Sequence, residues 1–383
     1  MSASPFLQAV RRADNLQVPT TDLVSNVLQS PSDQTGPTSL RPWSIPLHLA
    51  RADMQAGLTP IGWLRPAVRA FLEYHWPEGD LGEPMIEFGI CRELAKEGTV
   101  GNCHQDGPEF AFVSQRLLDQ GYEGLTREMN RLARYMKDKG MYSECLDGWR
   151  DEHYEIFASP KSSYFASGGS GVSSSGATNR AFDFERAACA VFGLATFGVH
   201  MTAYEGEGEE MKIWVPKRSA TKATWPSKLD NSVAGGIPAG MVPFESMIKE
   251  CEEEASLPES LTRKLVRPAG FVSYFHVTEE GWFQPEYEYV YDLKMPARES
   301  PEYQSLKPFD DEVDSFQLLP VREVIDTLQN DPTAFKPNCG LIIVDFLIRH
   351  GMITVENEPD FFEIGWSCHK DLGKIVPFPV RRR

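Results

Sequence analysis

A glycine-rich turn that runs directly into an acidic helix constrains this chain more than any other feature. The turn is residues 234–240, AGGIPAG, and the helical pattern follows in residues 243–257, PFESMIKECEEEASL. Glu250, Glu253 and Glu254 stand at i, i+3 and i+4, so they share one face of the helix. Three like charges within one turn repel each other unless a cation lies among them, and carboxylate oxygens suit Mg²⁺.

The same helix has an apolar face for packing. Phe244, Ile248, Cys251 and Ala255 form a stripe opposite the acidic one, as expected for a helix that docks on a sheet. An isolated acidic run is most often a solvated surface. The glycine turn immediately before it favours a site instead, because glycines let a backbone bend back close to a helix start.

The pattern resembles the Nudix box, the motif of hydrolases that cleave nucleoside diphosphates linked to another group, and related diphosphates. The box reads Gly, five residues, Glu, seven residues, Arg-Glu, an aliphatic, any residue, Glu-Glu, any residue, Gly and an aliphatic. Its positions fall here on Gly235, Met241, Lys249, Glu250, Cys251, Glu253, Glu254, Ser256 and Leu257. Met241, Lys249 and Ser256 depart from the pattern, whereas the three metal-type glutamates remain, so we interpret the site as a variant active site.

The flanks are similar to one Nudix subfamily, found in fungi and plants and related to thiamine pyrophosphokinase. The resemblance rests on residues 228–236 (KLDNSVAGG) and 249–255 (KECEEEA) and covers about residues 40–365. It implies an α/β fold, a Nudix α/β/α sandwich with a mixed sheet, preceded by a smaller α+β N-terminal domain. In that subfamily the first Glu of the box is often missing, as at Met241.

Composition limits the partners. The chain has 383 residues and a formal net charge of -17, so it is a poor general binder of nucleic acid or anionic membrane. Its seven cysteines form no CxxC pair, which argues against a zinc or redox pair and indicates a reducing compartment. We expect the cytoplasm, with the mitochondrion as alternative, and a monomer or homodimer.

The organisation along the chain follows from composition shifts and periodicity. We expect a poorly ordered segment at 1–40, an α+β domain at 41–165, a low-complexity loop at 166–180, the Nudix domain at 181–355 and a C-terminal tail at 356–383. Residues 182–192 read as a helix that leads into the Nudix domain. Strands are expected near 198–204, 212–215, 270–278, 282–295 and 315–320, with helices at 321–328 and 340–349.

Diphosphate cleavage needs a cation that neutralises the phosphates and a group that orients the attacking water, and both predict particular residue types. We predict that Mg²⁺ or Mn²⁺ is held by Glu250, Glu253 and Glu254, with Glu253 open as third ligand or base. Glu254 and the loop residue Glu312 are the other predicted catalytic residues. Phosphate or ring contacts are predicted for Arg218, Lys222, Trp225, Gly235, Gly236 and Phe275.

The resemblance implies the substrate, a small-molecule diphosphate: thiamin diphosphate or its oxidised, damaged forms, giving the monophosphate and phosphate. Residue chemistry alone reaches only a metal-dependent diphosphate hydrolase. Two alternatives stay open at this point. One is a nucleotide-type substrate such as ADP-ribose, and the other is a module that binds thiamin diphosphate without cleaving it.

Overall fold

The computed structural model describes residues 3–16, 44–90, 109–169, 171, 173, 176–309 and 311–381. The C-terminal half is built on one mixed sheet with the strand order β10-β11-β7-β8-β12, and β9 pairs with β7 beside β8. Its elements are β7 (Thr196–Glu205), β8 (Lys212–Arg218), β9 (Val233–Gly236), α12 (Pro243–Ala255), α13 (Glu259–Leu265), β10 (Arg267–Val277), β11 (Phe283–Lys294), β12 (Val313–Pro320), α14 (Val321–Asn330), α15 (Pro337–Arg349) and α16 (Phe361–Cys368), with short 3₁₀ turns η3 (Gly208–Glu210) and η4 (Leu372–Lys374).

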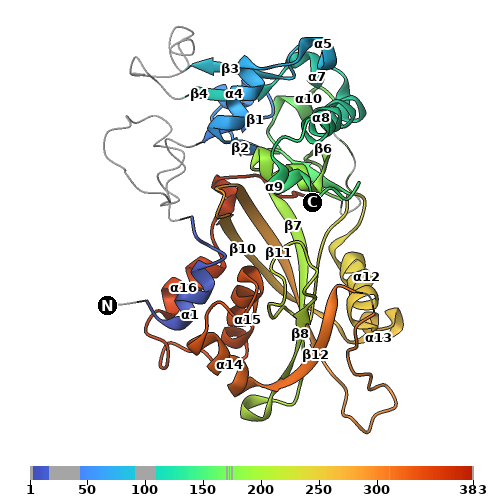
Figure 1. The fold of residues 1–383 in the computed structure, drawn as a ribbon, viewed down its shortest axis with the longest axis vertical. Coiled ribbons are helices and arrows are strands. Elements are labelled where there is room, and N and C mark those ends of the chain that lie inside the picture. The colour runs from blue at the N-terminus through green and yellow to red at the C-terminus, as the bar shows by residue number, and fades with distance from the viewer. Residues whose placement is uncertain are drawn as a thin grey trace.

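Helices cover both faces of this sheet, so the expected α/β/α sandwich with a mixed sheet is confirmed (Figure 1). One face packs Val199 and Val233 against Met247 and Cys251 of α12. The other face packs alternate residues of β10 and β11, such as Val272 and Val290, against α15. The parallel pair β7–β11 lies at the centre, as expected for strands buried on both sides.

The N-terminal half has its own core around a four-stranded sheet of order β2-β1-β4-β3 and a separate β5–β6 hairpin. The amphipathic α8 packs on β6. The elements are β1 (Ile45–His48), α3 (Arg51–Gln55), β2 (Gly62–Leu64), α4 (Pro66–Tyr74), α5 (Glu78–Leu81), β3 (Ile86–Ile90), β4 (Glu109–Val113), α7 (Gln115–Leu118), α8 (Gly121–Asp138), α9 (Ser143–Leu146), β5 (His153–Phe157), α10 (Ser163–Ala166), β6 (Arg180–Glu185), α11 (Arg186–Cys189) and η2 (Ala190–Phe192).

Two expectations about local structure are wrong. Residues 3–16, expected to be poorly ordered, include α1 (Pro5–Arg11), which buries Phe6, Leu7 and Val10 beside α14, α15 and α16 (Figure 1). The rest of that segment, residues 17–40, lies outside the described residues. Residues 180–185 form strand β6 rather than the start of a helix, and only residues 186–192 are helical.

The segment after α16 wraps around the free edge of the C-terminal sheet. Lys370 N–H donates to the Ser273 carbonyl at the β10 edge (3.0 Å), which takes the chain from the α15 face to the α12 face. Leu372 and Ile375 then pack with Phe275 on that second face. Trp63 of the N-terminal half donates its indole N–H to the Ile375 carbonyl (3.0 Å), so the segment joins both halves.

Candidate active site

Strand β9 and helix α12 bring the glycines and glutamates of the motif together. The Glu250 carboxyl lies directly over Gly235, where any Cβ would collide with it. The Ser246 hydroxyl of α12 donates to the Gly236 carbonyl (3.0 Å) and ties the helix to the strand. Glycine at 235 is therefore a steric requirement of the acidic helix, since the strand must approach the carboxylate closely.

Glu250 and Glu254 lie one turn apart and carry perturbed pKa values. Burial, with the charge of Glu253 added, raises the pKa of Glu250 to about 7 against the opposing effect of Lys249. Burial also raises the pKa of Glu254 to about 8, together with the charges of Asp230 and Glu250. The Ala234 backbone N–H donates to Glu254 Oε2 (3.0 Å) and opposes that rise. Two carboxyls held in this way favour either protons or a cation.

Glu253 lies apart from this pair. Its side chain is about half exposed and accepts a hydrogen bond from Lys249 Nζ (2.6 Å). Lys249 also lies 3.5 Å from Glu250 Oε1, so the Lys that replaces the family's Arg bridges two of the three glutamates. Glu253 is thus paired with a cation and turned to solvent, in contrast to Glu250 and Glu254.

Arg218, predicted to clamp phosphate, instead holds its own loop. The guanidinium is buried, forms an ion pair with Asp230, and donates to the carbonyls of Trp225 (3.1 Å) and Thr224 (3.0 Å). The Trp225 ring is partly buried, with the Arg12 guanidinium 5.9 Å from its centroid. The prediction for Arg218 is corrected, because its donors are already used to shape the 219–229 loop.

Lys222 and Glu312 form one unit at the edge of the site. Lys222 Nζ lies 2.5 Å from Glu312 Oε2, and Arg150 Nη1 lies 3.8 Å from Glu312 Oε1. Burial opposes but does not overcome the Lys222 hydrogen bond, so the pKa of Glu312 is lowered. The Lys222 charge also acts on Glu254. Glu312 is therefore a weak base in this arrangement, because its proton affinity is reduced by two cations.

Phe275, predicted to stack on a ring, is fully buried in the core where the C-terminal segment crosses the sheet. It has no exposed face for a ligand, so that prediction is corrected. Phe275 does lie on the α12 face of the sheet, but Leu372 and Ile375 pack over it. Sequence alone gave no sign that residues from the far C-terminus would cover it.

The N-terminal half contributes residues that the sequence did not single out. The Tyr154 hydroxyl of β5 occupies the space over Gly236, where a Cβ would collide with it. The His153 carbonyl accepts from Ala239 N–H (2.7 Å) in the glycine turn. Arg186 lies with its guanidinium 5.2 Å from the Tyr154 ring centroid, and Glu250 is among the charges that raise the pKa of Arg186 against burial. The start of α11, directly after β6, thus contributes a cation whose charge is felt by the acidic helix.

The residues present fit a divalent cation with oxygen ligands. In the part of the chain that the structure describes, no three His, Cys, Asp or Glu side chains converge as a complete metal cage. Mg²⁺ is usually held by one or two carboxylates, with water and substrate phosphates completing its shell. The Glu250–Glu254 pair matches that arrangement, and burial raises the pKa of both carboxyls.

Comparison with known proteins agrees with this geometry. Residues 196–339 match the NUDIX domain family model. A Saccharomyces cerevisiae protein described as uncharacterized, YJR142W, is 35% identical over 326 residues, which span 74% of this chain and 86% of that protein. The chain belongs to the Nudix family. The yeast match extends well beyond the Nudix domain, so the relative shares more than the motif.

Two Arabidopsis thaliana proteins are also similar. Nudix hydrolase 20, chloroplastic, is 34% identical over 247 residues, 64% of this chain and 58% of that protein. Nudix hydrolase 24, chloroplastic, is 34% identical over 248 residues, 65% of this chain and 60% of that protein. The chain therefore spans about three fifths of the length of these plant Nudix hydrolases. Family and site together make this chain a Nudix hydrolase, of the class that acts on diphosphates.

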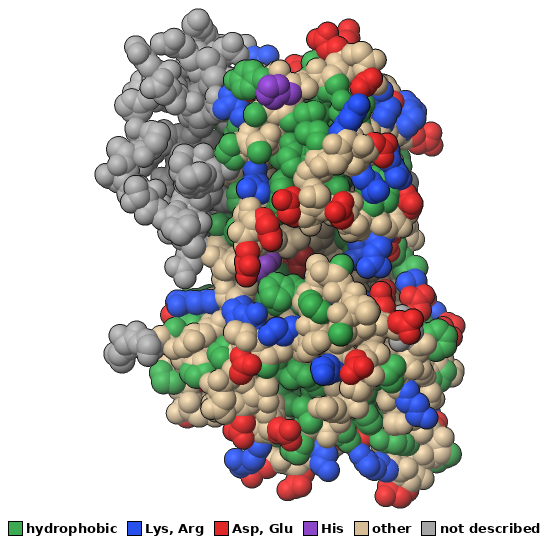
Figure 2. Space-filling view, in the orientation of Figure 1, with side chains coloured by type: hydrophobic (Ala, Val, Ile, Leu, Met, Phe, Trp, Pro, Cys, Tyr) green, Lys and Arg blue, Asp and Glu red, His purple; other side chains and the backbone are tan. Residues whose placement is uncertain are grey.

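None of the helices in the described residues is both long and apolar enough to cross a membrane. Acidic and basic side chains are interspersed over the face of the Nudix protein that Figure 2 shows.

Proposed function

We propose that this Nudix hydrolase cleaves thiamin diphosphate, or oxidised forms of it, to the monophosphate and phosphate. The observation that carries the hydrolase part is the Glu250–Glu254 pair, two half-buried or buried carboxyls with raised pKa values over a glycine strand. The thiamin part is supported by the subfamily resemblance in the box and its flanks.

The roles of the residues follow from their surroundings. Glu250 and Glu254 would hold Mg²⁺ or Mn²⁺, whose chemistry is to neutralise the phosphate oxygens and acidify a water. Lys222, whose charge acts on Glu254, and Arg186, whose pKa is raised in part by Glu250, are proposed to bind phosphate oxygens by charge. Glu253, paired with Lys249, is proposed to position that lysine and, after loss of the ion pair, to accept a proton.

The glycines have a steric role in the proposal. Gly235 and Gly236 leave room for the Glu250 carboxyl on one side and the Tyr154 hydroxyl on the other. Trp225, partly exposed in the 219–229 loop, is proposed to contact the substrate at the Lys222 side. A reducing compartment such as the cytoplasm is part of the proposal, and Cys145, Cys189, Cys251, Cys339 and Cys368 are free thiols.

The test is phosphate release from thiamin diphosphate, its oxidised analogues and ADP-ribose, each with Mg²⁺ and with Mn²⁺. Turnover of the thiamin compounds that needs metal supports the proposal. Turnover of ADP-ribose alone keeps the hydrolase and removes the thiamin assignment. Tight binding of thiamin diphosphate without turnover would identify a binding module.

A further inference from the structure

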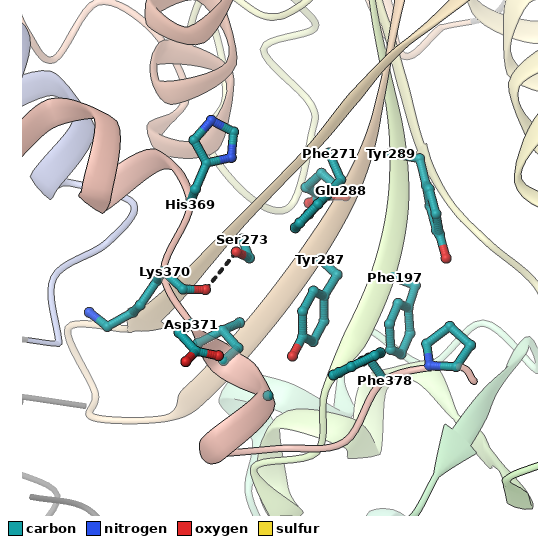
Figure 3. A pocket seen from close by; sticks show the side chains of 13 residues that line it. Phe197, Phe271, Ser273, Tyr287, Glu288, Tyr289, His369, Lys370, Asp371 and Phe378 are labelled. Atoms are coloured by element: carbon teal, nitrogen blue, oxygen red, sulfur yellow. Dashed lines mark hydrogen bonds between the residues drawn. The ribbon is translucent and has the colours of Figure 1, made fainter. Parts of the chain in front are cut away.

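A cavity of about 490 Å³ lies on the face of the Nudix sheet that also carries α12. Its wall is aromatic: Phe197 on β7, Tyr287 and Tyr289 on β11, and Phe378 from the C-terminal segment (Figure 3). The Phe197 and Tyr287 rings are stacked, with centroids 5.3 Å apart and planes 5° from parallel. The ring centroid of Phe378 lies 6.1 Å from that of Tyr287. A flat ring of a ligand in this cavity could therefore contact aromatic side chains on more than one side.

Strand register places this cavity beside the carboxylate pair. Val199 of β7 is paired with Gly235 on one side and with Tyr289 on the other. Gly235 and Tyr289 are thus two strand spacings apart, about 10 Å. The Glu250 carboxyl lies over Gly235, and Tyr289 lines the cavity. A diphosphate at Glu250 and a ring in the cavity are therefore within the reach of one small molecule.

The C-terminal wall of the cavity is firmly attached. The Ser273 hydroxyl donates to the Lys370 carbonyl (2.7 Å), as the dashed line in Figure 3 marks. Asn179 Nδ2 of the N-terminal half donates to the Phe378 carbonyl (2.9 Å). Lys370 Nζ is directed away from the cavity to Asp14 (2.6 Å). Phe378 is 45% exposed and is held mainly through its backbone, so its ring can contact a ligand.

Building on the proposed diphosphatase function, we propose that this cavity holds the aromatic ring system of the substrate while its diphosphate lies at Glu250 and Glu254. Residues 369–379 lie beyond the matched family region, 196–339. The segment outside the family domain then sets which ring is accepted. The electron-rich faces of the tyrosine and phenylalanine rings favour a flat heteroaromatic ring, and a cationic one most.

The experiment compares Phe378→Ala with Phe362→Ala, an exposed aromatic of α16 that does not line the cavity. KM and kcat are measured for thiamin diphosphate and for methyl diphosphate, which has no ring. We expect Phe378→Ala to raise KM for thiamin diphosphate about tenfold, with kcat and the methyl diphosphate constants unchanged, from the loss of stacking. Phe362→Ala should change neither substrate.

A second readout does not depend on turnover. Binding of thiamin, which carries the rings but no phosphate, is measured by calorimetry in metal-free protein. Phe378→Ala and Phe271→Ala, an exposed residue on the β10 side of the cavity, should each weaken that binding several-fold. Unchanged thiamin binding and an unchanged KM ratio in both variants would overturn the cavity assignment. Thiamin binding that is lost in the variants, in a protein that hydrolyses no thiamin compound, would retain the cavity and refute the proposed function.

Discussion

Individual residues determine the chemistry of the site, and the two carboxyls of α12 are the most informative. Glu250 and Glu254 are the members of the predicted acidic trio that burial has perturbed, whereas Glu253 is turned to solvent. The i, i+3, i+4 spacing predicted that all three share a face. It did not predict how far each side chain reaches, because that depends on Lys249 and on the glycine strand beneath.

Replacing Glu254 or Glu250 by Gln should reduce metal-dependent turnover by about 10²- to 10³-fold, as loss of a ligand and of charge at the phosphates costs several kcal/mol. The matched control is Glu252→Gln, an exposed glutamate of the same helix. Steady-state kinetics over a range of Mg²⁺ concentrations is the measurement. An equal loss of turnover in the Glu252→Gln variant would mean that turnover depends on the net charge of the helix rather than on a specific metal site.

The raised pKa values make stability depend on pH in a defined direction. Between pH 4.5 and about 7 for Glu250, and between pH 4.5 and about 8 for Glu254, the folded protein is expected to keep a proton that the unfolded chain has lost. Their contribution to stability is therefore full below about pH 4.5 and is lost as pH rises through 7 and 8. Each pKa unit corresponds to about 1.4 kcal/mol, so a loss on the order of 2 kcal/mol is expected after allowance for solvent.

Calorimetry of metal-free protein at pH 5.5 and 8.5 checks this dependence, and added Mg²⁺ should restore stability mainly at the higher pH. Glu254→Gln should flatten the metal-free profile, since its amide has no proton to lose. A metal-free profile that rises with pH and is identical in that variant would contradict the assignment.

At the scale of secondary-structure elements, the packing of α12 on β9 determines how closely the Glu250 carboxyl approaches the backbone of Gly235. Gly235→Ala should displace the Glu250 carboxyl, because the new Cβ collides with it, at a cost of about 1–3 kcal/mol in stability and a clear loss of Mg²⁺ affinity. Gly365→Ala in α16, where a Cβ meets open space, is the control. Thermal unfolding and Mg²⁺ titration are the measurements. Normal Mg²⁺ affinity in Gly235→Ala would show that the close approach is not needed.

The elements also show where sequence reasoning succeeded and where it failed. The acidic helix was predicted because Phe244, Ile248 and Cys251 repeat with helical spacing. Residues 182–192 were misread because β6 buries its charged residues as well as its apolar ones, with Arg180 paired to Asp183, so apolar periodicity does not mark the strand. The helical residues that begin at Arg186 also follow β6 without a break. Phe275 was misplaced because its cover, Ile375, lies 100 residues further along the chain.

At the scale of the whole molecule, the N-terminal half and the C-terminal segment both complete the Nudix domain. Strand β5 places the Tyr154 hydroxyl over Gly236, Arg186 at the start of α11 is within the electrostatic influence of Glu250, and residues 369–379 form a wall of the aromatic cavity. Neither contribution was predictable from the motif, since both depend on long-range packing. The site therefore belongs to the whole chain rather than to residues 196–339 alone.

Arg186→Gln tests the contribution of the N-terminal half. Loss of this cation should raise KM for the diphosphate several-fold at low salt and leave thermal stability nearly unchanged, since its Glu152 partner is partly exposed. Arg134→Gln, which removes an exposed ion pair with Asp151, is the control. An unchanged KM in Arg186→Gln would show that this cation does not bind the diphosphate.

The most direct test of the proposed diphosphatase site is phosphate release from thiamin diphosphate by the full chain, with and without Mg²⁺, beside the Glu254→Gln variant. We expect metal-dependent release of one phosphate per substrate, and this release should be nearly abolished in the variant. Release that is independent of metal, or equal in Glu254→Gln, would contradict that expectation.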